Sequence, residues 1–134
     1  MIRPWWGEYV GLPFVDGGRG ANGVDCWGLV RLVYADHLSI ALPTYGEISA
    51  HDLARIARQM RAGQDDGWRC PAVPQDFDIC LMRGPRGGVA TVHVGLVAGP
   101  GHILHCEEVT GTVRVPVTHF TIAGRITGYR RRSP

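Results

Sequence analysis

The sequence lacks any long uninterrupted run of apolar residues. Its start contains Arg3, Pro4 and Gly7 in place of the continuous apolar stretch of a secretory signal peptide. No segment approaches the roughly 20 apolar residues that a membrane-spanning helix needs. We therefore expect synthesis in the cytoplasm without a signal peptide, no insertion into a membrane, and a separate route to any substrate outside the cell.

Charge of either sign is also scarce. Charged residues make up 19% of the chain, and the formal net charge is only +2 at pH 7. Nucleic-acid-binding domains usually carry a concentrated basic face, so this balance argues against a nucleic-acid partner. The one basic cluster, Arg130 to Arg132, is interpreted as a solvated terminus, with docking to an acidic partner or an anionic polymer as the alternative.

Cysteine is limited to four residues that form no C-x-x-C pair: Cys26, Cys70, Cys80 and Cys106. Such spacing predicts neither a zinc ribbon nor a disulfide framework. The chain has no internal repeat and no low-complexity linker, and its 45% of apolar residues suffices for one core but hardly for two. We expect residues 1–134 to form a single domain.

Regular elements are predicted in the order of helices first and strands afterwards. Apolar residues recur at spacings of three and four after Asp25, a natural N-cap, and a second helix is expected over residues 50–62. The glycine-rich stretch 16–23 and residues 63–74 are expected to be loops. Strands joined as an antiparallel meander are expected at residues 78–83, 91–98, 102–107, 112–117 and 125–130. This order predicts an α+β fold.

Cys26 lies in the first turn of the first predicted helix. A thiol is a strong nucleophile only as thiolate, and the unpaired amides and dipole at a helix N-terminus lower its pKa. The glycine-rich stretch is expected to leave this thiol accessible, and the Cys26 amide is a candidate oxyanion donor. A buried, inert cysteine is the alternative, because many cysteines pack as small apolar residues.

His93 and His105 are the candidates for a catalytic base and its partner. If residues 99–101 form a three-residue loop, Gly95 faces His105 in an antiparallel hairpin, and His93 lies on the same face, diagonal to His105. Gly95 then leaves open space between the two imidazoles, whereas a two-residue turn would separate them. Cys106 points to the face opposite His105, which argues against a metal site shared by these neighbours.

The motifs form an ordered set along the chain. Pro13-Phe14 and Gly17-Gly18 precede the run Asp25-Cys26-Trp27-Gly28-Leu29-Val30, and Asp78-Ile79, His93-Val94-Gly95-Leu96 and Ile103-Leu104-His105 follow it. This set resembles the NlpC/P60 cysteine peptidases over nearly the whole chain. The resemblance implies a papain-like fold, with N-terminal helices packed on an antiparallel sheet of five to six strands.

The resemblance also implies a function. Cys26 corresponds to the nucleophile, His93 to the general base and His105 to the polar residue that orients the base, in a mechanism that needs no metal or organic cofactor. Members of the family typically cleave amide bonds in the stem peptides of peptidoglycan, which is then the expected substrate. Three further residues are weaker candidates for binding the substrate or the oxyanion: Phe14, Gly18 and Asp25.

Two residues depart from the pattern that the family usually shows. Phe14 stands where the family usually has tyrosine, and Trp27 stands where serine is common. The run of residues 25–30 and the ending Gly128-Tyr129-Arg130-Arg131 look most like peptidase domains in tail-assembly or tail-tip proteins of long-tailed phages. This likeness implies other tail-tip proteins as partners and a location at the virion tail tip, from which the chain reaches the bacterial wall.

Two alternatives stay open. A structural tail-tip module with the same fold would show little or no hydrolysis, and the absence of tyrosine at position 14 favours it. The intact set of Cys26, His93 and His105 argues against it, because a structural part needs no thiol beside two imidazoles. Acyl or amide transfer on a small cytosolic molecule is the third interpretation, since such scaffolds are reused for different functions.

Overall fold

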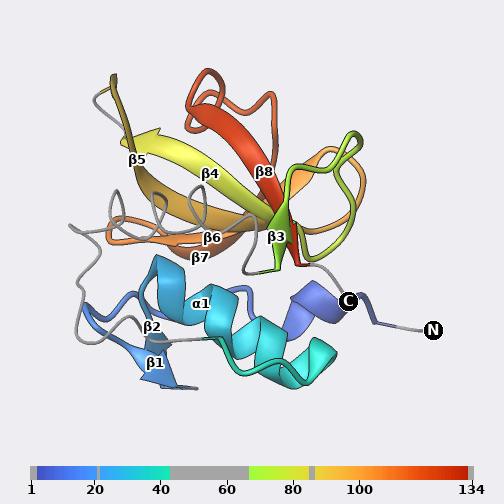
Figure 1. The fold of residues 1–134 in the computed structure, drawn as a ribbon. Helices are drawn as coiled ribbons and strands as arrows, with labels where there is room; N and C mark the ends of the chain where they lie inside the picture. Colours follow the sequence, from blue (N-terminus) through green and yellow to red (C-terminus); the bar gives the residue numbers. More distant parts are fainter. Residues whose placement is uncertain (1–2, 21, 43–66, 85–86, 133–134) are drawn as a thin grey trace.

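A helical layer packs against a six-stranded antiparallel sheet in the computed structural model, which describes residues 3–20, 22–42, 67–84 and 87–132 (Figure 1). The sheet has the strand order β3-β8-β4-β5-β6-β7, and β1 and β2 form a separate ladder. The elements are, in chain order, η1 (Trp5–Glu8), β1 (Arg19–Gly20), β2 (Gly23–Val24), α1 (Cys26–Val33), η2 (Tyr34–Leu38), β3 (Trp68–Arg69), β4 (Ile79–Gly84), β5 (Gly87–Val97), β6 (His102–Glu107), β7 (Gly111–Pro116) and β8 (Ile126–Arg132).

The α+β fold predicted from the sequence is confirmed. The first helix begins directly after Asp25, and β4 to β8 each overlap a predicted strand. Two expected loops contain short strands instead. In the glycine-rich stretch 16–23, β1 lies inside the stretch and β2 begins at its last residue, and β3 lies within residues 63–74. Strands of two residues are too short for an alternating pattern to reveal them. The helix predicted over residues 50–62 lies outside the described residues.

A first core cluster joins the helical layer to one face of the sheet. The buried residues of α1 are Cys26, Trp27, Gly28, Leu29, Val30 and Val33. Their partners on the sheet include Leu81, Val94, Leu96, Leu104 and Cys106. Among the helices in the described part of the chain, none has the length and apolar character needed to cross a bilayer.

The opposite face of the sheet carries a second, smaller core cluster, made of Cys80, Met82, Val97, Ile103 and Ile122. Successive residues of a strand point to opposite faces of its sheet. His93 alternates in step with Val97 on β5, and His105 alternates in step with Ile103 on β6. Both histidines therefore belong to the face that looks away from α1.

The hairpin of β5 and β6 has the register that the sequence predicted. Leu96 pairs with Leu104 and Val97 pairs with Ile103, which leaves residues 99–101 as the connecting loop. Both glycines of this loop have positive φ values, 82° and 68°. Glycine adopts this region without strain, so the loop is built for these residues.

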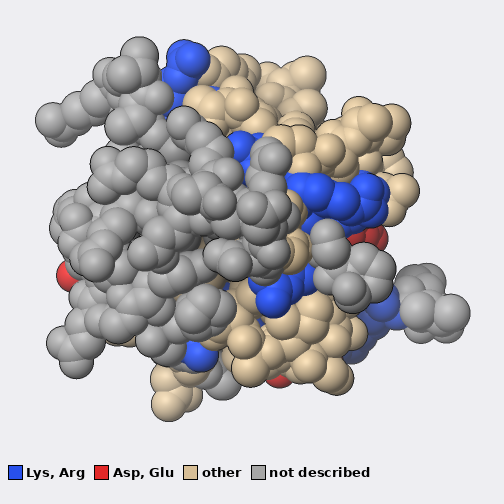
Figure 2. Space-filling model, viewed as in Figure 1, with Lys and Arg blue, Asp and Glu red and all other residues tan. Residues whose placement is uncertain are grey.

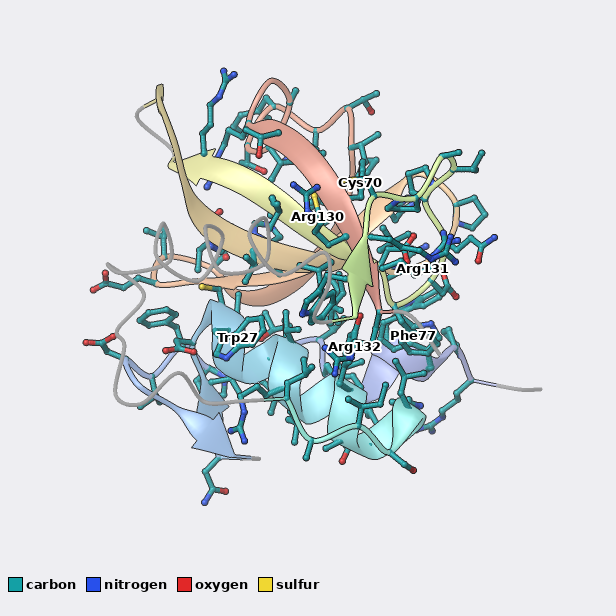
Figure 3. All side chains as sticks on the ribbon, in the orientation of Figure 1. Trp27, Cys70, Phe77, Arg130, Arg131 and Arg132 are labelled. Carbon is teal, nitrogen blue, oxygen red and sulfur yellow. The ribbon has the colours of Figure 1, made fainter. Side chains whose placement is uncertain are left out.

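The basic cluster of Arg130 to Arg132 is part of the sheet. Figure 2 shows basic side chains gathered beside β3 and β8, and Figure 3 labels these three arginines. Arg131 donates to the Asp78 carboxylate at 2.7 Å and 2.8 Å, and the Arg132 guanidinium lies 5.3 Å from the centre of the Trp68 ring. The expectation of a solvated terminus is wrong, because β8 continues through these residues and pairs with β3 and β4.

Candidate active site

Cys26 is the first residue of α1, and a tight backbone arrangement fixes the turn around it. Asp25 is the N-cap, and its Oδ1 accepts a hydrogen bond from the Gly28 amide at 2.7 Å. The Gly18 carbonyl accepts from the Asp25 amide at 3.2 Å. A Cβ atom on Gly28 would collide with this same carbonyl. The glycine-rich stretch therefore packs directly on the N-terminus of the helix.

The three weaker candidates from the sequence all support this turn. Asp25 caps the helix and Gly18 holds Asp25 through the backbone. Phe14 forms an isolated parallel bridge with Val24 and packs, partly buried, against the first core cluster. Packing and capping account for the positions of all three residues, and contact with a substrate stays a prediction.

The Cys26 thiol is buried, with 1% of the residue exposed. Burial, and next the Asp25 carboxylate, raise the pKa of this thiol well above its ordinary value, although the amides of Val94 and Trp27 act in the opposite direction. The expectation of an accessible thiol with a lowered pKa is wrong for this structure, because desolvation outweighs the helix N-terminus. The Cys26 side chain is therefore a neutral thiol at pH 7.

His93 and His105 meet as the hairpin parity predicted. His93 Nε2 lies 2.8 Å from His105 Nδ1, and the ring planes stand at 75° to each other. Gly95 does not leave open space, since a Cβ atom there would lie 3.0 Å from His105 Cβ and 2.9 Å from the Leu104 carbonyl. The absence of a side chain at Gly95 instead lets β6 approach closely enough for the imidazoles to bond.

Cys26 approaches β5 from the layer opposite to the two histidines. Cys26 belongs to the first core cluster, whereas His93 faces the side of the second cluster. The sulfur meets β5 at the amide of Val94, the residue directly after His93. Because His93 Nε2 is bonded to His105, Nδ1 is the ring nitrogen of His93 that this bond does not engage. The Cys26 sulfur and the His93 ring thus lie at neighbouring positions of β5.

An ion pair outside the predicted set extends the histidine pair. Glu107 Oε1 lies 3.4 Å from His105 Nδ1, and Arg125 Nη1 donates to the same oxygen at 3.0 Å. Glu107 had a signal in the sequence, because a residue two positions after His105 shares its face of the strand. Arg125 precedes β8 in the chain, and no local pattern connects it to β6.

The donor atoms of His93, His105 and Glu107 all lie within 4.8 Å of one another, which calls for a comparison with a metal site. Ligands of tetrahedral zinc, each about 2.0–2.1 Å from the ion, are about 3.3 Å apart. The two histidine nitrogens are closer, at 2.8 Å, and Arg125 already holds the carboxylate. The group is therefore a hydrogen-bonded chain. Cys106 points to the other face, as predicted, within the first core cluster.

The pKa values of both histidines are lowered. Burial is the main cause for His93, and repulsion from a protonated His105 and from Arg125 acts in the same direction. For His105, burial again lowers the pKa, Glu107 opposes this effect, and Arg125 and His119 add to it. Both rings are therefore neutral at pH 7, which is the state that a general base requires.

Acid is expected to destabilise the fold through His93. The pKa of this residue is below 6.5 in the folded chain, so the unfolded chain binds more protons as the pH falls below that value. The free energy of unfolding should then fall by up to about 1.4 kcal/mol per pH unit for this one group. Urea unfolding at about pH 7.5 and about pH 5.5 measures this slope. The variant His93→Gln should show a smaller slope, and an unchanged slope would contradict the assignment.

Comparisons with known proteins agree with this architecture. The family model described as the NlpC/P60 family matches residues 11–131. The NlpC/p60 domain of the peptidoglycan hydrolase SagA is similar, with 19% identity and a TM-score of 0.60 over 92% of this chain and 88% of that one. An NlpC/P60 family protein from Bacillus cereus has 20% identity and a TM-score of 0.62, over 94% of this chain and 37% of that one.

A further similar structure is the P60 domain of an antigen from M. avium subspecies paratuberculosis, with 21% identity and a TM-score of 0.56. It aligns over 94% of this chain and 87% of that one. The comparison with curated proteins gives no match. At these identities the solved structures establish the fold, and the family model spans the helix with Cys26 and both strands that carry the histidines. The chain belongs to the NlpC/P60 family.

Proposed function

We propose that the chain is a cysteine peptidase that hydrolyses amide bonds in the stem peptides of peptidoglycan. Cys26 is the nucleophile, His93 is the general base, and His105 orients the base. The observation that carries the proposal is the 2.8 Å contact between His93 Nε2 and His105 Nδ1, next to the strand position that the Cys26 sulfur meets. Family membership supports the substrate class, and one similar structure is named a peptidoglycan hydrolase.

The bond to His105 decides which nitrogen of His93 acts. When His93 Nε2–H donates to His105 Nδ1, the unprotonated nitrogen of His93 is Nδ1. This atom takes the thiol proton of Cys26 while the sulfur forms a bond to the amide carbon. It then gives the proton to the leaving amine as the carbon–nitrogen bond breaks. Water attacks the thioester next, passing a proton to the same nitrogen and restoring the thiol.

In the tetrahedral intermediate, the former carbonyl oxygen carries a negative charge, which a hydrogen-bond donor has to stabilise. The amide of Cys26, at the first position of α1, has no acceptor within the helix. It is therefore the backbone group best placed to stabilise an oxyanion at this sulfur. Because the thiol has a raised pKa, no thiolate forms in advance. Proton transfer to the neutral His93 has to accompany the attack.

We infer that this activity serves the tail tip of a long-tailed phage. The run of residues 25–30 and the ending 128–131 resemble the peptidase domains of tail-tip proteins, and this likeness supports the inference. A chain carried there is made in the host cytoplasm and acts on the wall from outside. Its partners are then other tail-tip proteins, and its task is local degradation of the wall.

A structural tail-tip module without hydrolysis is the second candidate. The burial of the Cys26 thiol and its raised pKa favour this alternative, since both reduce nucleophilicity. The bonded histidine pair favours the peptidase, because two buried imidazoles are costly to keep for packing alone. Release of wall peptides separates the two candidates.

The test compares the chain with Cys26→Ala on purified peptidoglycan fragments. New amine ends should appear with the wild type and be absent with the variant. The sequence contains no lysine, so an amine-reactive dye labels the released wall amines over little signal from the protein. Mass spectrometry of the products identifies the bond that is cut.

The matched control is Cys70→Ala, which removes an exposed cysteine away from the helix start. This variant should release as much amine as the wild type. Equal release by Cys26→Ala, or release by none of the three proteins, would contradict the peptidase. In the second case, co-purification with tail proteins would favour the structural module.

A further inference from the structure

The histidine pair continues into an ion pair that the mechanism above does not use. Glu107 stands two residues after His105 on β6, and Arg125 comes from the segment before β8. We propose that Arg125 is a positioning residue: by holding the Glu107 carboxylate, it keeps the proton of His105 on Nε2 and leaves Nδ1 as the acceptor for His93. This proposal rests on the proposed function, because the tautomer matters for catalysis only if His93 is the base.

The two neighbours of His105 Nδ1 favour opposite protonation states of this nitrogen. His93 Nε2 lies 2.8 Å away and Glu107 Oε1 lies 3.4 Å away. A carboxylate only accepts hydrogen bonds, so Glu107 favours a proton on Nδ1. His93 can act as base through its own Nδ1 only if its Nε2 carries the proton and donates it to His105. The carboxylate therefore works against the productive tautomer.

The other nitrogen of His105 does not decide between the two tautomers. Nε2 is buried, and it has no hydrogen-bond partner within the described part of the chain. With a proton it lacks an acceptor, and without a proton it lacks a donor. Each tautomer leaves this nitrogen unpaired, so the surroundings of Nδ1 decide where the proton lies.

Arg125 weakens the preference of Glu107 for a proton on His105 Nδ1. Nη1 donates to Oε1 at 3.0 Å and Nη2 to Oε2 at 3.4 Å, so the oxygen that faces His105 already has a donor. Arg125 is 8% exposed, and it also donates to the carbonyls of Arg83 and Thr121 at 3.0 Å and 2.9 Å. The cation is thus held in place and cannot leave the carboxylate to solvent.

Loss of Arg125 is expected to release Glu107 as an acceptor for His105. Within the described structure, the partners of the carboxylate are His105 and Arg125. His105 then carries its proton on Nδ1, and the proton of His93 moves to the nitrogen that should receive the thiol proton. His119, from the loop after β7, also lowers the pKa of His105, but it does not bind Glu107.

The test reads both tautomers in the full chain with isotope-labelled histidine, through long-range proton–nitrogen NMR spectra near neutral pH. In the wild type, both His93 and His105 should carry the proton on Nε2. In Arg125→Met, the proton of His105 should move to Nδ1. The double variant with Glu107→Gln should restore the wild-type pattern, because the competing carboxylate is gone.

The matched control is Arg114→Met, which removes another partly buried arginine bonded to a carbonyl, that of Ala98 at 2.7 Å. Its histidine spectrum should equal that of the wild type. A wild-type His105 with the proton on Nδ1 overturns the proposal, as does an unchanged pattern in Arg125→Met. If Arg125→Met does not fold, the wild-type spectrum decides alone, with a proton on Nε2 in support and on Nδ1 against.

Kinetics add a second measurement on the same variants. Arg125→Met should lower kcat by about 100-fold or more with little change in KM, in the direction seen when a triad base is held in the wrong tautomer. The double variant should recover most of this loss, and failure to recover overturns the proposal. The spectra need no activity. A wild type that does not hydrolyse peptidoglycan would therefore refute the proposed function and leave the tautomer result standing.

Discussion

Replacing His93 with glutamine is expected to lower kcat/KM on peptidoglycan stem peptides by about 100-fold to 10,000-fold, the usual contribution of a general base. Glutamine retains an N–H that can donate to His105 Nδ1, so the partner of the lost ring keeps its bond. What disappears is the nitrogen that accepts the thiol proton. The effect should be large because the Cys26 thiol has a raised pKa and supplies almost no thiolate by itself.

The control for this prediction is His102→Gln. His102 begins β6, and its ring bonds the Pro100 carbonyl in the hairpin loop at 2.8 Å, away from the site. This variant should keep wild-type activity. Circular dichroism has to show that both variants are folded. A folded His93→Gln that retains more than about a tenth of the activity would contradict the role of general base.

Replacing Gly28 with alanine is expected to destabilise the fold and remove activity together. The new Cβ atom would collide with the Gly18 carbonyl, which is backbone and cannot rotate away. Overpacking of this kind costs about 1–3 kcal/mol or more, against a gain of about 1 kcal/mol in helix propensity. Because the collision is with backbone, we expect a net loss near the upper end of this range, about 2 kcal/mol, which lowers the melting temperature by about 7 °C for a chain of this size.

Gly7→Ala is the matched control, since a Cβ atom at Gly7 meets nothing within 4 Å and the residue has no positive φ. Its melting temperature should equal that of the wild type. Thermal unfolding followed by circular dichroism measures both variants. If Gly28→Ala has the same melting temperature as the wild type, the Gly18 backbone does not pack on the start of α1 as described.

The hairpin of the two histidines was predictable because its geometry depends on neighbours in the sequence. A three-residue loop fixes the register, and the two-residue period of a strand then puts His93 and His105 on one face. The helix start was predictable for the same reason, since Asp25 and the apolar spacing after it lie within one short segment. Local rules thus placed all three proposed catalytic residues.

The environment of Cys26 and the role of Arg125 were not predictable in this way. The pKa of the Cys26 thiol depends on how completely the sheet covers it. The general effect of a helix N-terminus on a thiol pKa takes no account of this burial. Arg125 reaches Glu107 from 18 positions further along the chain. The pairing position of Gly95 opposite His105 was predicted correctly, but the close approach of β6 there followed from packing and not from the alternation itself.

The position of Cys26 and His93 in different layers has a kinetic consequence. Cys26 belongs to α1, and His93, the proposed base, belongs to β5. The contact between helix and sheet therefore sets the distance between their side chains. A displacement of about 1 Å in such a contact can slow a reaction about 100-fold. Under the proposed mechanism, turnover should therefore depend on the packing of the two layers and should change with core substitutions that touch neither Cys26 nor His93.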